Sequence, residues 1–315
     1  MHIVDQLLEQ GYRVHGTVRD AEKAVWTSKY FKDRYGVGRY TPVSIPDMAR
    51  QDAFDIAVRG CSGVVHVASV TSMSPDPNEV ITPSIAGALN ALEAAAKEPA
   101  VRRVVYCSSV AAAVSHDRGV RNEITSDSWN MLDFEDAWAP PPYERNRAMA
   151  VYASSKMQTE AAVWRWYAKK KPAFVLNTVL PDTLWGRILD LRHQGLPSSV
   201  GVLKAIYDSS DFTFLPGYSV DVQDSALLHV AALILPDVSG QRIFAASTPW
   251  NVQSLVQLLR GLYPHSNIGG EIPDLGVDQA LFTDAGKAEE LLRRMGKQGW
   301  TDLETSVERT CESFF

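Results

Sequence analysis

Three side chains near the middle of the chain could together move a proton to or from a carbonyl oxygen. Tyr152 and Lys156 are four residues apart, so both lie on one face of the helix that the apolar pattern predicts at 149–169. An ammonium group beside a phenol favours the phenolate and lowers the phenol pKa from its usual value of about 10. Ser109 follows an apolar strand predicted at 102–107, and its hydroxyl could donate to the same oxygen. These residue types predict an acid–base site for carbonyl chemistry.

A Tyr-x-x-x-Lys pattern is weak evidence by itself, because a chain with 11 tyrosines offers several chances for it. Tyr167 and Lys171 form a second such pair at the end of the same helix, where a solvated cationic helix end explains the lysines. The Tyr152 pair is preferred because a buried strand that ends in serine precedes it. Of the two adjacent serines, Ser109 is the choice and Ser108 is the alternative.

The elements that would position these side chains alternate between strand and helix. Apolar runs predict strands at 12–18, 40–45, 63–68, 102–107, 173–179 and 242–246. Helical spacing predicts helices at 3–10, 21–30, 51–59, 78–98, 149–169, 200–207, 224–234, 251–263, 284–295 and 302–313, with an irregular stretch at 115–147. This repeat indicates an α/β fold with a doubly wound parallel sheet, and the weaker regularity after 181 indicates a smaller, interleaved C-terminal lobe.

The composition bounds the kind of partner. A net charge of −6 argues against nucleic acid and against an anionic membrane surface, so a small soluble ligand is expected. No window is apolar for the length of a membrane span, and the first residues show no targeting pattern. The three cysteines, Cys61, Cys107 and Cys311, have unrelated spacings, which favours reduced thiols over a disulfide or a metal site. We therefore expect a cytoplasmic protein without a metal.

Several segments resemble one known family. They are V-V-Y-C-S-S at 104–109 before Tyr-x-x-x-Lys, G-V-V-H-V-A-S at 63–69, and the segments 16–20, 181–186, 220–224 and 299–300. They are similar to the extended short-chain dehydrogenase/reductases of the NAD-dependent epimerase/dehydratase superfamily, in the dihydroflavonol-reductase-like branch with the fungal NADPH-dependent ketone and aldehyde reductases. The resemblance covers essentially the whole chain. It implies a Rossmann-type dinucleotide-binding core at 1–180 and a mainly substrate-binding lobe at 181–315, with about 220–246 returning to the core.

The resemblance also implies roles for single residues. Tyr152 would donate the proton in a reduction, Lys156 would bind the nicotinamide ribose, and Ser109 would orient the carbonyl. Asp47, after the strand at 40–45, would meet the adenine.

Two further positions of the resemblance would touch the cofactor. Ala68 would lie against it, and Pro181 would open the loop under the nicotinamide. His66, on the same strand as Ala68, is expected to be a packed strand histidine and not a ligand.

Arg19 decides between the two nicotinamide cofactors. Enzymes that prefer NAD place an acidic side chain at the end of the second strand of the fold, whereas an arginine there suits the 2′-phosphate of NADPH. Lys23, one helical turn further on, would add a second cation. A solvated arginine after a strand is the alternative interpretation. The expected cofactor is NADPH.

One family feature is missing from the sequence. The fold normally starts with a strand and a Gly-x-x-Gly-x-x-Gly turn, whose amides hold the pyrophosphate. Here His2, Ile3 and Val4 match the helix that follows that turn. Because the first strand is central in such a sheet, we expect a shortened or mis-started form of a competent enzyme, which binds NADPH poorly as given.

The predicted function is an NADPH-dependent carbonyl reductase that acts on a ketone or aldehyde of a small alkyl or aryl metabolite, such as an intermediate of secondary metabolism. A sugar-nucleotide epimerase or dehydratase is the alternative among enzymes, and it should carry an acidic residue in place of Arg19. A catalytically silent dinucleotide-binding regulator is the alternative outside enzymes. Its weakness is that a regulator needs no proton donor, whereas Tyr152 is present.

Overall fold

The computed structural model describes the whole chain except residues 23, 116–121, 197, 209, 211–215, 267, 269–275, 277 and 315, and the side chains of 198 and 285. The chain divides into two compact units that are interleaved in sequence. The first comprises residues 1–115, 129–179 and 229–242, and the second comprises residues 116–128, 180–228 and 243–315. All residues predicted to do chemistry, and all but Pro181 of those predicted to bind the cofactor, belong to the first unit.

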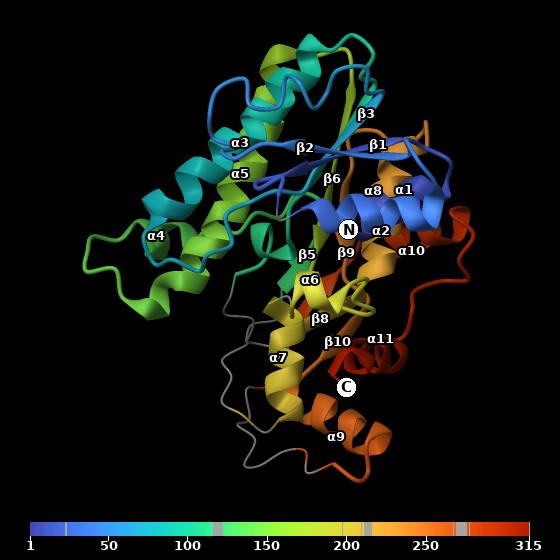
Figure 1. Ribbon diagram of the computed structural model, residues 1–315. Coiled ribbons are helices and arrows are strands. Elements are labelled where there is room, and N and C mark those ends of the chain that lie inside the picture. Colours follow the sequence, from blue (N-terminus) through green and yellow to red (C-terminus); the bar gives the residue numbers. More distant parts are fainter. Residues whose placement is uncertain are drawn as a thin grey trace. The chain divides into compact units, whose positions relative to one another are not determined.

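Parallel strands form the centre of the fold, which confirms the predicted α/β class. The main sheet has the order β3-β4-β6-β9, formed by β3 (Gly63–His66), β4 (Arg103–Cys107), β6 (Val175–Pro181) and β9 (Arg242–Ala245). β4 pairs in parallel with both β3 and β6 (Figure 1). A separate parallel pair consists of β1 (Val14–Val18) and β2 (Tyr40–Ser44). The carboxyl ends of these strands carry the residues of the candidate site.

Among the described residues, no ladder of hydrogen bonds joins the β1–β2 pair to the main sheet. The first element of the chain is helix α1 (His2–Glu9), as the pattern predicted. The expectation of a missing strand and Gly-rich turn stays a prediction.

The first unit also contains α2 (Val25–Tyr35), α3 (Pro77–Lys97), η1 (Val110–Ala112), α4 (Leu132–Trp138), η2 (Arg145–Arg147) and α5 (Ala148–Lys170). Of these helices, α3 and α5 share a core with strands of the main sheet. α3 and α5 run side by side (Figure 1). Their shared core joins Leu92 of α3, Val163 of α5, Val104 of β4 and Leu176 of β6, each at most 2% exposed. This packing fixes α5, the helix of Tyr152 and Lys156, against the sheet.

Two local predictions were wrong. Residues 51–60 form successive turns and no helix, because Asp52 has a φ of +59° and most of the local hydrogen bonds run from residue i+3 to residue i. The segment still buries Phe54 and Val58 against α3 and β2, so its apolar spacing reflects packing. The stretch predicted to be irregular contains α4 and the short strand β5 (Asn122–Ile124).

Gly16 leaves space for an aromatic ring on β1, the strand that precedes Arg19. A Cβ atom on Gly16 of β1 would lie 2.4 Å from the ring of Tyr40 on β2. Tyr40 packs on Phe31 of α2 and its hydroxyl accepts a hydrogen bond from Thr27. Glycine therefore allows this ring to cross the strand.

The second unit contains two small sheets. One has the order β10-β8-β7, with β7 (Thr183–Trp185), β8 (Gly217–Asp221) and β10 (Thr248–Trp250), and the other pairs β5 with β11 (Ala280–Phe282). Its helices are α6 (Leu191–Gln194), α7 (Ser198–Tyr207), α9 (Val252–Leu262), α10 (Ala285–Arg294), α11 (Leu303–Cys311) and η3 (Glu312–Phe314), and α8 (Val222–Ile234) begins in it. Trp185, Trp250 and Leu255 lie in its core.

Two motifs that carried the resemblance meet in the second unit. Asp224, near the start of α8, is fully buried and forms an ion pair with Lys297. Its carboxylate also accepts hydrogen bonds from the Thr301 amide at 2.6 Å and the Thr301 hydroxyl at 3.1 Å. The segment 220–224 is thus tied to the residues that follow Gly299 and Trp300.

Within the part of the chain that the structure describes, none of the helices combines the length and the apolar character that crossing a bilayer requires.

Candidate active site

Helix α5 holds Tyr152 and Lys156 on one face. The Lys156 Nζ atom lies 5.9 Å from the centre of the Tyr152 ring, and the lysine side chain is buried. Lys156 forms no hydrogen bond or ion pair with another described residue. Because no carboxylate neutralises this buried ammonium, its positive charge acts on the neighbouring groups. The pair therefore has the geometry that the i, i+4 spacing predicted.

The end of β4 separates the roles of the two serines. The Ser108 hydroxyl donates a 2.8 Å hydrogen bond to Glu160 on α5. The Ser109 Oγ atom accepts a 3.3 Å hydrogen bond from the Ala111 amide and caps η1. An acceptor role leaves the Ser109 O–H free to donate, and no described residue accepts that proton. This arrangement supports Ser109 as the serine that acts on a substrate oxygen.

The charge of Lys156 lowers the pKa of two neighbouring groups. Burial, followed by the Lys156 ammonium, lowers the pKa of His66 to about 4. His66 stacks on Tyr106 at a centroid distance of 6.1 Å and contacts Phe54 edge to face. It is therefore a neutral, packed strand histidine, as the sequence predicted.

The second group is the thiol of Cys107, at the end of β4. Burial raises the pKa of Cys107, but the His229 imidazole and then the Lys156 ammonium outweigh it, so that the pKa is lowered. The cationic field thus extends to the end of β4, beside the serines, where an oxyanion would form.

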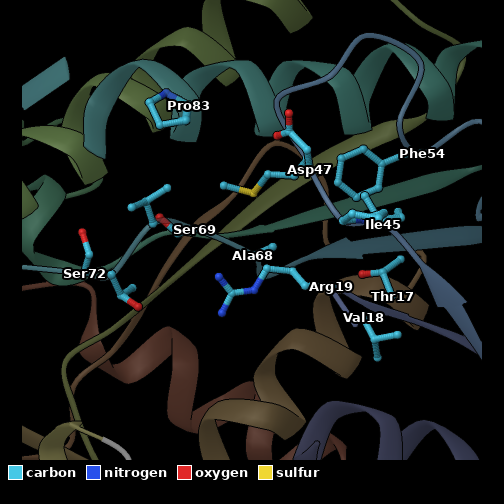
Figure 2. A pocket seen from close by; sticks show the side chains of 14 residues that line it. Thr17, Val18, Arg19, Ile45, Asp47, Phe54, Ala68, Ser69, Ser72 and Pro83 are labelled. Carbon is cyan, nitrogen blue, oxygen red and sulfur yellow. The ribbon is translucent and has the colours of Figure 1, made fainter. Parts of the chain in front are cut away.

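A cavity of about 730 Å³ opens beside the ends of β1, β2 and β3. Its walls are Thr17, Val18, Arg19, Ile45, Pro46, Asp47, Met48, Phe54, Ala68, Ser69, Val70, Thr71, Ser72 and Pro83 (Figure 2). The cavity brings together Arg19, Asp47 and Ala68, three of the residues predicted to bind the cofactor. Ligands of open α/β sheets bind outside the carboxyl ends of the strands.

The cavity walls fit a phosphorylated dinucleotide. The Arg19 guanidinium forms no hydrogen bond or ion pair with another described residue, so it is available for a phosphate. One oxygen of Asp47 accepts a 2.8 Å hydrogen bond from the Ala49 amide, which fixes the carboxylate at the rim. Ile45, Phe54 and Val70 supply apolar walls for a flat ring.

Pro181 and Lys23 were also predicted to bind the cofactor, and Pro181 is not one of the cavity walls. Lys23 falls outside the described residues. Pro181 is the last residue of β6, is buried and belongs to the second unit. The roles assigned to both residues stay predictions. Among the described residues, no three or more His, Cys, Asp or Glu side chains gather into a group that could hold a metal ion.

Sequence reasoning missed Glu160, which joins the helix of Tyr152 to the end of β4. Its one local signal is its position four residues after Lys156, on a helix face whose neighbours are otherwise small or apolar. The cavity residues Thr17, Ser69 and Ser72 were also missed, because no spacing in the sequence distinguishes them from ordinary loop residues.

Comparisons with known proteins agree with this geometry. The family described as "NAD dependent epimerase/dehydratase family" matches residues 1–183. The chain is 35% identical over 311 residues to aldehyde reductase 2 of Sporidiobolus salmonicolor, covering 97% of this chain and 90% of that protein. It is 36% identical over 318 residues to ketoreductase adrE of Penicillium rubens, covering 98% and 90%. The crystal structure of Gre2 of Candida albicans with NADPH superposes with a TM-score of 0.81 at 26% identity, covering 99% and 94%.

The chain therefore belongs to the NAD-dependent epimerase/dehydratase family, the extended short-chain dehydrogenase/reductases. The family resemblance predicted from the sequence is confirmed.

Proposed function

We propose that this protein is an NADPH-dependent carbonyl reductase, which reduces a ketone or aldehyde of a small alkyl or aryl metabolite to an alcohol. The observation that carries the proposal is the pairing of Tyr152 with the buried Lys156 on α5, in a unit whose cavity presents Arg19 without a partner among the described residues. The relatives named aldehyde reductase and ketoreductase support reduction of a carbonyl.

Each residue has a defined task in this proposal. NADPH, when bound, supplies the hydride for the carbonyl carbon. Tyr152 protonates the carbonyl oxygen, and the Lys156 ammonium stabilises the phenolate that remains. Ser109 donates a hydrogen bond to the oxygen as negative charge develops on it. Arg19 binds the 2′-phosphate of the cofactor.

Further cofactor contacts complete this assignment. Asp47 and Ala68 line the cavity, where Asp47 would meet the adenine and Ala68 would lie against the cofactor. Lys23 would add positive charge for the 2′-phosphate, and Pro181 would contact the nicotinamide. Lys156 has a second task, because its ammonium also binds the nicotinamide ribose.

Arg19 favours NADPH chemistry over the epimerase alternative. An enzyme that keeps NAD through a sugar epimerisation needs an acceptor for the ribose 2′-hydroxyl, whereas Arg19 is a cation without a described partner. Purification without added cofactor checks this point. NAD retained at one molecule per chain contradicts the reductase proposal.

The setting of the proposed reaction follows from charge and cysteine chemistry. A net charge of −6 favours a small-molecule partner over a nucleic acid or an anionic membrane surface. Cys61, Cys107 and Cys311 are free thiols, which suits the reducing cytoplasm.

The test is oxidation of NADPH by the purified chain, followed by absorbance, with a panel of alkyl and aryl ketones and aldehydes. Tyr152→Phe removes the proton donor and should lower kcat by at least about 100-fold. Tyr167→Phe is the matched control, since Tyr167 lies on the same helix and its hydroxyl donates to the Phe174 carbonyl, at 3.1 Å. An equal loss in both variants, or no turnover of any carbonyl by the unaltered chain at a saturating concentration of NADPH, overturns the proposal.

A further inference from the structure

A buried carboxylate lies one turn beyond Lys156 on α5. Glu160 is fully buried, and Arg242, which pairs with it, is almost fully buried. Its Oε1 atom accepts hydrogen bonds from Thr178 at 2.8 Å, Arg242 at 2.9 Å and Trp164 at 3.3 Å. Its Oε2 atom accepts from Ser108 at 2.8 Å and from Arg242 at 3.2 Å. These five residues form what is called here the Glu160 network.

Stability alone does not account for such a network. Removing two charges from water costs about as much as their attraction returns, and a buried ion pair can often be replaced by apolar residues without loss. A fully satisfied polar network instead selects one arrangement of the elements it joins. Here those elements are α5, the end of β4, β6 through Thr178 and the start of β9 through Arg242.

The network joins the two halves of the proposed site. Ser108 is the residue before Ser109, so its bond to Glu160 fixes the backbone from which Ser109 extends. Glu160 shares a helix face with Lys156 at i, i+4 spacing, and Lys156 with Tyr152 at the same spacing. Ser109 is thus joined to Ser108 by a peptide bond, Ser108 to Glu160 by a hydrogen bond, and Glu160 to Lys156 and Tyr152 by the backbone of α5.

A second connection runs from Arg242 to Ser109 by a different route. The Arg242 guanidinium lies over the Trp129 ring, 4.1 Å from its centre. The next residue, Asn130, is buried and donates to the carbonyls of Ala111 at 2.9 Å and Val114 at 3.0 Å. These bonds hold η1, the single turn that Ser109 caps. The Glu160–Arg242 ion pair is therefore connected to Ser109 by two routes, one through Ser108 and one through Trp129 and Asn130.

We propose that Glu160 is a positioning residue for carbonyl reduction, which holds Ser109 in register with Tyr152 and Lys156. Glu160 touches neither substrate nor cofactor in this role. The inference rests on the proposed function, since it assigns Ser109 a part in catalysis. A displacement of a catalytic group by about 1 Å can cost about 100-fold in rate.

The test is a double-mutant cycle on kcat with NADPH and a carbonyl that the unaltered chain reduces. Glu160→Gln should lower kcat at least about tenfold, with KM for NADPH changed less than twofold. In the Ser109→Ala background the same substitution should lower kcat less than twofold further, because the group it positions is gone. If the loss of kcat in the double variant equals the product of the two single losses, the inference is overturned.

Ser108→Ala repeats the cycle if Glu160→Gln does not fold, because it removes a single hydroxyl from the network. Thr178→Val is its matched control. It deletes another 2.8 Å bond to the same carboxylate, but β6 does not carry Ser109. Ser108→Ala should lower kcat about tenfold and Thr178→Val less than twofold, at similar losses of thermal stability.

Two outcomes separate the inference from the proposed function. Equal losses of kcat in Ser108→Ala and Thr178→Val, in an active enzyme, overturn the inference alone and leave a merely structural network. An unaltered chain that reduces no carbonyl overturns the proposed function, and the positioning role with it.

Discussion

Ser108 and Ser109 are consecutive residues at the end of β4, yet their hydroxyls have opposite roles. Ser108 donates to the buried carboxylate of Glu160, and Ser109 accepts from the Ala111 amide. A donor whose proton is already held by a carboxylate is poorly placed to stabilise a second oxygen, whereas an acceptor keeps its own proton free. The structure thus gives a physical reason for assigning the substrate contact to Ser109 and the structural contact to Ser108.

Ser109→Ala should therefore damage chemistry more than folding. Loss of one donor to a developing oxyanion lowers kcat by about 100- to 1,000-fold. Loss of the cap on a single turn costs about 1 kcal/mol of unfolding free energy. Ser108→Ala should show the reverse balance, with about 1 to 3 kcal/mol of stability lost and a loss of kcat near tenfold. Steady-state kinetics and urea unfolding of both variants measure the two effects.

The assignment is reversed if Ser108→Ala is the variant with the larger loss of kcat. Ser108 would then be the catalytic serine that the sequence left open as the alternative. The hydrogen bond from Ser108 to Glu160 would then exist only in the free enzyme, and a bound substrate would replace it.

Much of the fold and part of the site follow from local sequence patterns. The strand at 102–107 and the helix at 149–169 agree closely with β4 and α5, because continuous apolar runs and helical spacing are local signals. The spacing of Tyr152 and Lys156 predicts their shared face for the same reason. The family resemblance assigned Arg19 and Asp47, which come just after strands, to the cofactor, and both line one cavity.

The remainder depends on contacts between distant residues. Phe54 and Val58 have helical spacing, but they pack on β2 and α3 from a series of turns, which the backbone at Asp52 imposes. Glu160 receives its partners from residues 52 positions before it and 82 after it. No local pattern marks such a carboxylate as buried, because acidic residues on helices are usually exposed.

Arg19→Ala should weaken the preference for NADPH. A charged hydrogen bond to a phosphate contributes about 1.5 to 3 kcal/mol, so KM for NADPH should rise at least about tenfold while KM for NADH changes little. Arg13→Ala is the control for a general loss of positive charge, because Arg13 is exposed before β1 and is not part of the cavity wall. Parallel kinetics with the two cofactors make the measurement.

Two results would contradict this role for Arg19. One is an equal rise of KM for both cofactors, which means that Arg19 serves the shared part of the dinucleotide. The other is an equal rise of KM for NADPH in Arg13→Ala, which means that net charge and not a specific contact attracts the cofactor.

Asp224→Asn should strongly destabilise the protein. Asp224 is fully buried and binds Lys297 and Thr301, whereas the Lys297 side chain is 31% exposed, so the loss of these charged hydrogen bonds costs about 1.5 to 3 kcal/mol. The control is Asp33→Asn, which breaks an exposed i, i+4 pair with Lys29 and costs at most about 1 kcal/mol. Chemical unfolding gives both values, and similar losses in the two variants would falsify a stabilising role for Asp224.

His66 makes the fold sensitive to acid. Its pKa is lowered from 6.5 to about 4 by burial and then by Lys156, so the unfolded chain takes up a proton at a higher pH than the folded chain does. The contribution of His66 to the free energy of unfolding is therefore fully present above about pH 6.5. It is lost as the pH falls toward 4 and changes no further below that value. The total contribution of this histidine is about 3 kcal/mol.

His66→Phe should remove this part of the acid sensitivity. Phenylalanine keeps the ring packing on Tyr106 and Phe54, and it removes a buried Nε2 atom that has no hydrogen-bond partner among the described residues. The difference in unfolding free energy between the variant and the unaltered chain should thus grow in favour of the variant between pH 6.5 and 4. His265→Phe, the same change at an exposed histidine, should leave the pH dependence as it is. Parallel pH curves for the unaltered chain and His66→Phe would mean that His66 takes up its proton equally in both states, against the field of Lys156.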